Sequence, residues 1–578
     1  MYILGINAYH GDSAAALIKD GKVIAAIEEE RIRRIKHWAG FPSESIKFCL
    51  QYAGISIEDI DYVTIGRNPS AHLLKKLRSS FKKLINPKFL KDRFLNIKKV
   101  LSIKEELAET LKIDHKKIRA SIKLIEHHRS HLASTFFSSP FEEAAIISID
   151  GFGDFSSCMF AIGIGNKIKV LDSVTYPHSL GIFYTAFTQF LGFPCYGDEY
   201  KVMGLSAYGE PRYVEKLKDV IIKTNDGKFK LNEKYFLHSS RGVTMTWENT
   251  APFINRLYSD YFIEKFGKPR DPSEPITQYH MDLAASVQKI CEDIIFHMLN
   301  HLQKLTKMKN LCIAGGVAQN SVANGKIREN TDFERIYIPP AAHDAGNAIG
   351  SALWFYHQEL GNENRYFINN SFFGPHFEDH DIEKILKEKG VNYIKMADEN
   401  ELIEKVSDLL VNGAIIGWFQ GRTEFGPRAL GNRSILANPA RKDAKDLINK
   451  KIKRRESFRP FAPSILREFV SEYFEQDDDV YFMEKVFKIK PEKRELIPAV
   501  THVDGTGRLQ TVHKDITPLF YRLIERFRQK TGIPLLLNTS FNENEPIVNT
   551  PLEALDCYLR TDMDALVMGK ILVVKENK

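Results

Sequence analysis

Two stretches of the chain repeat one pattern, in which a short polar turn joins two apolar β-strands. The first stretch runs from Tyr2 to Ile18 with its turn at His10–Ser13, and a further strand, Val23–Ile27, follows it. The second stretch runs from Ala144 to Ile162 with its turn at Asp150–Asp154. Short apolar runs bounded by turn residues predict strands. Their recurrence predicts a duplicated α/β fold.

A hairpin with small polar residues in its turn is the phosphate-loop geometry of ATPases of the actin, Hsp70 and sugar-kinase type. One such hairpin is a weak signal, because many hairpins have polar turns. A further segment strengthens it, since the buried strand Asn310–Ala314 runs into Gly315-Gly316 and then Asn320. Glycines between a strand and a helix start expose backbone N–H groups that can meet a nucleotide.

Composition sets the class of protein and its division into domains. The 578 residues are 43% hydrophobic and 27% charged, as in a globular protein, and the length predicts roughly two or three domains. The polar stretch 360–377 indicates a boundary, so we expect domains at 1–365 and 366–578. We find no secretory signal and no apolar membrane span, and the six cysteines form no CxxC pair. These features predict a soluble, cytoplasmic protein with reduced thiols.

One segment carries most of the net charge. From Lys75 to Lys99 there are ten basic residues and one acidic residue, Asp92, within a basic insertion at about 71–123. Apolar residues interleave with the lysines at roughly helical spacing, although Pro87 must interrupt any helix. The segment fits a solvated helical excursion, and it fits equally a docking surface for an anionic acceptor, nucleic acid or a membrane surface.

Arginines in the C-terminal third lie beside glycines and prolines that fix the backbone. The first group lies in Gly421–Ser434 and the second in Lys453–Pro463. Guanidinium groups held by rigid backbone can grip a compact oxyanion with paired hydrogen bonds. We therefore predict a phosphate-binding site here, while Arg454 and Arg455 are equally well explained as solvated neighbours.

Two histidines and two aspartates form a candidate metal site. His127 and His131 are four residues apart on a predicted helix, which places both imidazoles on one face. Asp150 ends a buried strand and Asp344 precedes a small-residue helix. Two imidazoles and two carboxylates suit Fe(II), Mn(II) or Zn(II), although both aspartates could instead cap helices or tighten turns. Position 128 is His, so the glutamate of a zinc protease motif is absent.

Taken together and in order, these motifs resemble the NodU/CmcH/TobZ family of O-carbamoyltransferases. The resemblance covers nearly the whole chain and is weakest at 75–123. The matching segments are 5–15, 127–131, 150–154, 197–204, 314–320, 426–434, 458–463, 508–512 and 537–542.

The resemblance implies two domains and two reaction steps. It implies an N-terminal Kae1-like domain of the actin/Hsp70/sugar-kinase superfamily and a C-terminal YrdC-like α/β domain. The YrdC-like site would convert carbamoyl phosphate and ATP into carbamoyl-adenylate and pyrophosphate. At the Kae1-like site an acceptor hydroxyl would then attack the carbonyl and AMP would leave.

Residue roles follow from the matching positions. The clamp on carbamoyl phosphate and the ATP phosphates would comprise Arg428, Lys453, Arg459 and Arg508, with Ser540 donating a hydroxyl and Arg433 as a supporting residue. The metal ligands would be His127, His131, Asp150 and Asp344, holding Fe(II) or else Mn or Zn, while Mg accompanies ATP. The nucleotide contacts would be Gly315, Gly316 and Asn320.

The turn of the first hairpin supplies the candidate base. His10 would take the proton of the acceptor hydroxyl, because imidazole titrates near neutral pH, although it could also be a turn residue without a role. Asp12 would assist His10 or bind the acceptor. The expected partner is a small-molecule or carbohydrate acceptor, with membrane contact through Lys75–Lys99 and a homodimer as further possibilities; nucleic acid is not expected.

Three alternatives stay open at this stage. A hydrogenase-maturation carbamoyltransferase shares the chemistry but normally adds CxxC zinc fingers, which this chain lacks. A tRNA threonylcarbamoyl enzyme would use the basic segment for RNA, but the domain order argues against it. An ATP-binding regulatory protein of the Hsp70 type would have no use for a second oxyanion site.

Overall fold

The structure, a computed structural model, describes residues 1–72, 102–243, 245–246 and 250–575. The basic segment Lys75–Lys99 lies outside the described residues, so the two interpretations of it stay untested. The chain divides into two compact units. Unit 1 comprises 1–323 and 327–368, and unit 2 comprises 324–326 and 369–578.

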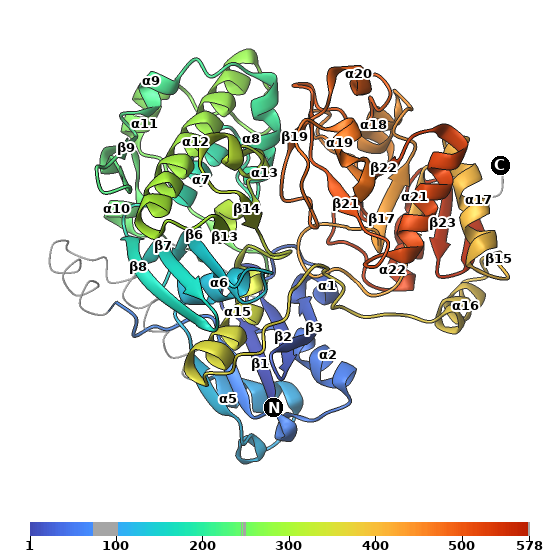
Figure 1. The fold of residues 1–578 in the computed structure, drawn as a ribbon, viewed down its shortest axis with the longest axis horizontal. Helices are drawn as coiled ribbons and strands as arrows, with labels where there is room; N and C mark the ends of the chain where they lie inside the picture. Colours follow the sequence, from blue (N-terminus) through green and yellow to red (C-terminus); the bar gives the residue numbers. More distant parts are fainter. Residues whose placement is uncertain (73–101, 244, 247–249, 576–578) are drawn as a thin grey trace. The chain divides into compact units, whose positions relative to one another are not determined.

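Unit 1 contains two five-stranded sheets with the same strand order (Figure 1). In the first sheet the order is β3-β2-β1-β4-β5, where β1 pairs antiparallel with β2 and parallel with β4. Its strands are β1 (Tyr2–Asn7), β2 (Ala14–Lys19), β3 (Lys22–Glu28), β4 (Tyr62–Ile65) and β5 (Ser121–Leu124).

The second sheet has the order β14-β13-β6-β7-β8, in which β6 pairs antiparallel with β7 and parallel with β13. Its strands are β6 (Glu143–Gly153), β7 (Ser156–Ile164), β8 (Lys167–Thr175), β13 (Asn310–Ala314) and β14 (Arg335–Tyr337). In each sheet a three-stranded meander is followed by two parallel strands, so the two sheets repeat one topology. The predicted duplication is confirmed.

Two helices lie between these sheets and position the candidate metal ligands. Helix α15 (Asn347–Leu353) packs on β1, and α6 (His127–Phe136) packs on β6 and β13. The two helices also contact each other. They approach closely at Gly350, where a Cβ would overlap the carbonyl oxygen of Ser130. This contact places the start of α15 beside the first turns of α6.

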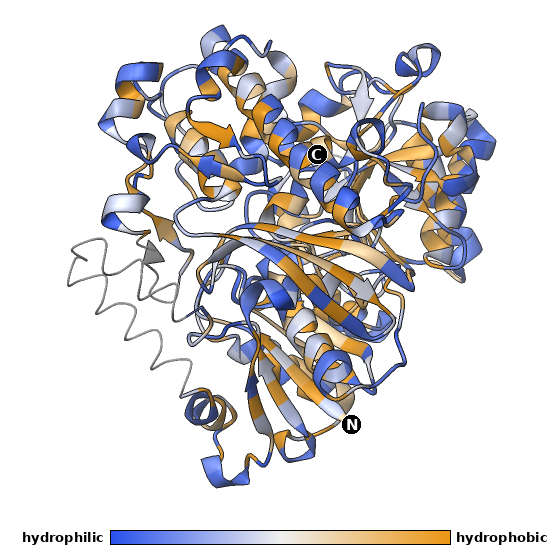
Figure 2. Ribbon diagram, turned by 60° about the vertical axis from the view of Figure 1, so that its left-hand side comes forward, coloured by the Kyte–Doolittle hydropathy of each residue, from blue (hydrophilic) through white to orange (hydrophobic). Residues whose placement is uncertain are grey.

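The long helix α12 (Gln278–Thr306) packs against α7 (Leu180–Phe190) and α8 (Glu199–Leu205) in unit 1. The helices carry a hydrophilic side and a hydrophobic side (Figure 2), as surface helices do. Among the helices of the described residues, none combines the length and the hydrophobicity that crossing a bilayer requires.

Unit 2 is built on an eight-stranded mixed sheet of order β15-β24-β23-β16-β17-β22-β18-β21. The strands are β15 (Ile394–Lys395), β16 (Ile416–Phe419), β17 (Arg433–Ala437), β18 (Ala462–Leu466), β21 (Gln510–Val512), β22 (Leu535–Ser540), β23 (Ala565–Met568) and β24 (Ile571–Val574). Helices cover both faces, which agrees with the predicted α/β class.

The two faces of this sheet bury separate cores because strand side chains alternate. Leu535 and Leu537 of β22 join the core beneath α16 (Asp379–Glu388) and α22 (Pro551–Arg560). Leu536 joins the other core, beneath α17 (Glu399–Val411) and α21 (Pro518–Thr531). The strand ends and the loops that follow them are thereby held on a rigid base.

Candidate functional site

Local structure explains how each of the four candidate metal ligands is held. Helix α6 begins at His127, whose N–H donates to the Asp154 carboxylate at 3.0 Å. Asp150 lies where the β6–β7 pairing is interrupted, between Ile149 and Gly153, so its side chain leaves the sheet pattern. Asp344 opens a short 3-10 turn that leads into α15.

The four ligand atoms converge. His127 Nε2 lies 3.0 Å and His131 Nε2 lies 3.2 Å from Asp150 Oδ2, and the two nitrogens are 3.1 Å apart. Asp344 Oδ1 lies 3.5 Å from His127 Nε2 and 3.3 Å from His131 Nε2. One atom from each residue falls within 4.8 Å of all the others. The tertiary structure thus brings together residues that are up to 217 positions apart in the sequence.

The donor set fits a divalent metal. Asp344 Oδ1 is buried and has no hydrogen-bond partner among the described residues, as expected of an atom whose partner is an ion. Burial opposes protonation of His127, but the charges of Asp344 and Asp150 raise its pKa to about 9. These carboxylates therefore create a negative potential at the point where both imidazole nitrogens meet. Mixed nitrogen and oxygen donors suit Fe(II), Mn(II) or Zn(II).

His10 is joined to this centre. Its Nδ1 lies 3.0 Å from Asp344 Oδ2, and its Nε2 is buried without a hydrogen-bond partner in the described chain. The carboxylate can only accept, so Nδ1 donates and Nε2 carries the lone pair. The imidazole is therefore oriented as a base.

Asp12 pairs with His37, whereas His10 pairs with Asp344. Asp12 Oδ1 pairs with His37 Nδ1 at 2.8 Å, and Glu30 accepts the backbone N–H of His37 at 2.8 Å. Burial would lower the pKa of His37, yet the charge of Asp12 and the hydrogen bond to it raise the pKa to about 9. The sequence offered no signal for His37, because its pairing depends on a loop folding back over the hairpin turn.

The predicted nucleotide contacts separate into two groups. The N–H of Gly316 donates to Asp150 Oδ1 at 3.2 Å, and Gly315 takes a φ of 93° where a Cβ would overlap the Ile149 carbonyl. Both glycines therefore lie at the metal centre. The side-chain amide of Asn320 instead exchanges two hydrogen bonds of 3.0 Å with Gln288.

Two further residues near the centre were missed. Asn347 places its Nδ2 3.2 Å from His131 Nε2. Arg67 follows β4 and donates to the Tyr9 carbonyl at 3.3 Å, while its charge interacts with Asp154 and Asp344. Neither belongs to a recognisable motif. His128, by contrast, is not a ligand: it bonds Ser148 Oγ at 2.7 Å, and burial lowers its pKa to about 3.

In unit 2 the predicted clamp forms an arginine cluster around Arg508. We define the cluster by the residues whose charges act on Arg508, namely Arg428, Arg455 and Arg459, together with Arg508 itself. Burial and these three like charges lower the pKa of Arg508 well below its ordinary value. Within the described residues the Arg508 guanidinium makes no hydrogen bond or ion pair. Four guanidinium groups gathered in this way suit an anion.

Two family models match the chain: Carbamoyltransferase N-terminus over residues 2–353 and Carbamoyltransferase C-terminus over residues 407–575. The chain belongs to the carbamoyltransferase family. Nodulation protein NolNO of Sinorhizobium fredii is 39% identical over 578 residues, covering 99% of this chain and 80% of its own. Nodulation protein NolO of Bradyrhizobium diazoefficiens is 41% identical over 456 residues, covering 78% and 79%. The crystal structure of T. kodakarensis HypF is 13% identical, with a TM-score of 0.30 and coverage of 62% and 48%.

These matches confirm the family predicted from the motifs, and the protein is a carbamoyltransferase in the general sense of its family. Arg455 belongs to the arginine cluster of this carbamoyltransferase, although no sequence feature separates it from Arg454. The two neighbours differ in their partners. Arg454 pairs with Glu543 at 3.1 Å, whereas Arg455 stacks on Phe461 and donates to Asn449 at 2.7 Å.

Lys453 and Ser540 lie together, as predicted. Lys453 Nζ donates to Asn542 Oδ1 at 2.6 Å, to the Asn542 carbonyl at 2.9 Å and to the Ser540 carbonyl. Ser540 Oγ also donates to Asn542 Oδ1, at 2.8 Å. The lysine thus fixes the end of β22, and a phosphate would have to replace some of these contacts.

Arg433, expected to support the clamp, contacts backbone carbonyls of unit 2. It is fully buried, and its guanidinium donates to the carbonyls of Gln420, Gly421, Asn432 and Pro375. It also stacks 3.6 Å from the ring centre of Phe419. Those acceptors belong to the turns that the glycines shape, so Arg433 holds the loop and does not face a ligand.

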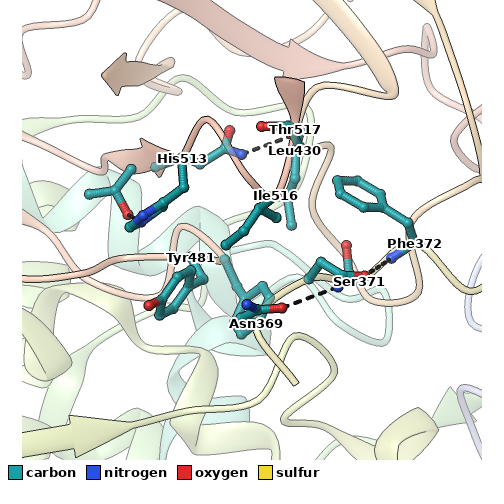
Figure 3. A pocket seen from close by; sticks show the side chains of 12 residues that line it. Asn369, Ser371, Phe372, Leu430, Tyr481, His513, Ile516 and Thr517 are labelled. Carbon is teal, nitrogen blue, oxygen red and sulfur yellow. Dashed lines mark hydrogen bonds between the residues drawn. The ribbon is translucent and has the colours of Figure 1, made fainter. Parts of the chain in front are cut away.

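Unit 2 of the carbamoyltransferase contains a pocket (Figure 3), and some of its lining residues are close in sequence to members of the arginine cluster. The rings of Tyr481 and His513 stack there at 5.0 Å, and Gln510 Nε2 donates to the Leu430 carbonyl at 2.9 Å. None of the predicted site residues lines this pocket. Gln510 nevertheless begins β21 two residues after Arg508, and Leu430 lies two residues after Arg428.

Proposed function

We propose that this carbamoyltransferase is an ATP-dependent O-carbamoyltransferase with two active sites. Unit 2, as a YrdC-like domain, makes carbamoyl-adenylate from carbamoyl phosphate and ATP. Unit 1, as a Kae1-like domain, transfers the carbamoyl group to a hydroxyl of a small-molecule or carbohydrate acceptor. The arginine cluster around Arg508 carries this proposal, because it offers guanidinium groups to an anion in a unit that is distinct from the metal centre.

The first step joins two polyanions. Atom balance requires one water to release phosphate from carbamoyl phosphate, after which the carbamate oxygen attacks the α-phosphorus of ATP and pyrophosphate leaves. Phosphate groups repel each other, and a cluster of fixed cations offsets that repulsion while holding the reacting atoms close. Arg428, Arg459 and Arg508 would bind the phosphates directly, with Lys453 and Ser540 at the end of β22.

The second step forms the product. The acceptor oxygen bonds to the carbamoyl carbon, the bond from that carbon to the AMP oxygen breaks, and the acceptor proton passes to His10 Nε2. Asp344 holds the imidazole in the basic tautomer through Nδ1. Gly315 and Gly316 would approach the nucleotide with their backbone.

His127, His131, Asp150 and Asp344 would hold the metal of unit 1. A bound Fe(II), Mn(II) or Zn(II) supplies Lewis-acid stabilisation of negative charge on a phosphate oxygen. Asp12 lies on the same hairpin turn as His10 and would accept a hydrogen bond from the acceptor.

The deciding experiment omits the acceptor. The full chain is incubated with carbamoyl phosphate and ATP, and pyrophosphate and carbamoyl-adenylate are measured. We expect both products, and neither without carbamoyl phosphate. A correctly folded protein that forms no adenylate would contradict the proposal, whatever its transfer activity.

A second measurement separates the two sites. Arg459→Ala should block adenylate synthesis, whereas His10→Asn should leave it intact and block only transfer from supplied carbamoyl-adenylate. Equal loss of both steps in both variants would contradict two separate sites.

A further inference from the structure

A histidine beside the arginine cluster has an unused acceptor. His502 lies in the loop before Arg508, and its Nε2 is buried without a hydrogen-bond partner among the described residues. The positive charge of Arg508 acts on this imidazole. Burial lowers the pKa of His502 to about 4, with Asp504 opposing the shift and Arg508 adding to it. The ring is therefore neutral near pH 7, with one donor nitrogen and one acceptor nitrogen.

Hydrogen bonds within the loop decide which nitrogen is the acceptor. Thr506 Oγ1 donates its only proton to Asp504 Oδ1 at 2.7 Å. His502 Nδ1 lies 3.1 Å from the same hydroxyl oxygen. Since that hydroxyl proton is already engaged, Nδ1 must donate, and the lone pair is left on Nε2. The backbone N–H of His502 donates to the Thr506 carbonyl at 2.8 Å, which holds the ring in this setting.

A second acceptor lies nearby. The backbone of Phe461 interacts with the His502 imidazole and favours its protonated form, which identifies the interacting group as the carbonyl. The contact falls short of hydrogen-bond geometry, because Nε2 has no partner at bonding distance and angle among the described residues. Phe461 also carries Arg455 of the arginine cluster on its ring, at 4.9 Å. Two acceptors, His502 Nε2 and the Phe461 carbonyl, thus lie together at the cluster, and no donor of the described residues bonds Nε2.

The arginine cluster itself cannot satisfy one part of the proposed substrate. Guanidinium groups only donate hydrogen bonds, so they suit the phosphate and carbonyl oxygens of carbamoyl phosphate. The substrate's amino group has two N–H donors and needs acceptors from elsewhere. We propose that His502 Nε2, with the Phe461 carbonyl, accepts the amino group of the carbamoyl donor and makes unit 2 selective for a carbamoyl over an acetyl group. This inference rests on the proposed function.

Binding to the full chain tests the inference without relying on catalysis. Dissociation constants for carbamoyl phosphate, acetyl phosphate and inorganic phosphate are measured by titration calorimetry. Acetyl phosphate carries a methyl group where carbamoyl phosphate has its amino group. We expect His502→Phe to lower the preference for carbamoyl over acetyl phosphate about tenfold, the equivalent of one lost hydrogen bond, with phosphate binding changed less than about twofold.

Three further variants sharpen the test. His502→Gln replaces Nε2 by an amide oxygen of similar reach and should retain part of the preference. Thr506→Val keeps the imidazole but removes the oxygen that fixes its tautomer, so a smaller loss in the same direction is expected. The exposed His380 of the same unit provides the control, and His380→Phe should leave all three constants unchanged.

The outcomes separate this inference from the proposed function. An unchanged preference in His502→Phe, in a protein whose melting temperature matches the wild type, overturns it. Equal weakening of all three ligands also overturns it, because His502 would then merely support the arginines. If the wild type prefers carbamoyl phosphate but forms no carbamoyl-adenylate, the proposed reaction is wrong, while the inferred site for the amino group is still supported. Wild type that binds no carbamoyl phosphate overturns both.

Discussion

The metal centre of unit 1 and the arginine cluster of unit 2 solve opposite electrostatic problems. In unit 1 two carboxylates and two imidazoles converge within 4.8 Å, and the carboxylates favour positive charge at their meeting point. In unit 2 the charges of three arginines act on Arg508, whose guanidinium has no carboxylate partner among the described residues. The first arrangement therefore suits a cation and the second an anion, in line with the proposed function.

The supporting elements differ in the same way. The ligands of unit 1 come from regular elements, namely α6, β6 and the 3-10 turn that leads into α15. The arginines of unit 2 come from loops, where glycine and proline fix the backbone, and a buried arginine such as Arg433 stabilises one of these loops from within. We therefore compare, for substitutions in each unit, the change in reaction rate with the change in the free energy of unfolding.

The largest expected effect is that of removing a metal ligand. His131→Ala should lower transfer from supplied carbamoyl-adenylate about 10³-fold and reduce bound metal, because it removes one of four donors. Adenylate synthesis should not change. Metal content is measured by mass spectrometry and transfer by product formation. The exposed His115 supplies the control variant, His115→Ala; full transfer activity in His131→Ala would break the comparison.

Removing the centre of the arginine cluster should have a comparable effect on the other step. Arg508→Ala should lower adenylate synthesis by about 10²-fold or more, because an oriented cation facing the phosphates is lost. The free energy of unfolding should stay equal or rise, since like charges around Arg508 are relieved. Kinetics and urea unfolding test both expectations. Arg454→Ala, at the outward-facing neighbour, should leave synthesis unchanged, and a stability loss in Arg508→Ala would contradict the assignment.

Arg433 should show the reverse pattern. Arg433→Met leaves several buried carbonyls without donors, so we expect the free energy of unfolding to fall by about 3 kcal/mol. In the protein that remains folded at low temperature, the dissociation constant for carbamoyl phosphate should change less than that of Arg508→Ala. Urea unfolding and calorimetry measure the two quantities. If Arg433→Met lost carbamoyl phosphate binding at unchanged stability, Arg433 would be a phosphate ligand.

The smallest expected effect concerns the Asp12–His37 pair of unit 1. The charges around His37 are Asp12, Glu30 and Lys36, and its pKa rises from 6.5 to about 9 on folding. Since the folded pKa is the higher one, the pair's stabilisation is complete below pH 6.5 and is lost as pH rises through about 9. We expect this pair to add about 2 kcal/mol to the free energy of unfolding below pH 6.5. The difference in unfolding free energy between wild type and His37→Gln should shrink over this interval, and a constant difference would disprove the linkage.

Much of unit 1 could be predicted from the sequence because its signals are local. Strand–turn–strand patterns identified both hairpins, and the spacing of His127 and His131 placed two imidazoles on one helix face. Asp150 and Asp344 were recognisable as carboxylates at element ends. Residues that meet only through loops, such as Asp12 with His37 or Asn347 with His131, left no periodic trace.

The sequence alone determined the family, the duplicated fold and the chemical types that each unit gathers, since these depend on local spacing and on ordered motifs. Only the tertiary structure decided which of the arginines lie together. Arg433, Arg454, Arg455 and Arg508 are alike as residues, and their backbone surroundings are similar in sequence. They differ in burial and in their nearest partners. Arg433 donates to backbone carbonyls, Arg454 pairs with the carboxylate of Glu543, and Arg455 donates to Asn449. Arg508 instead lies among the like charges of the other arginines of the cluster.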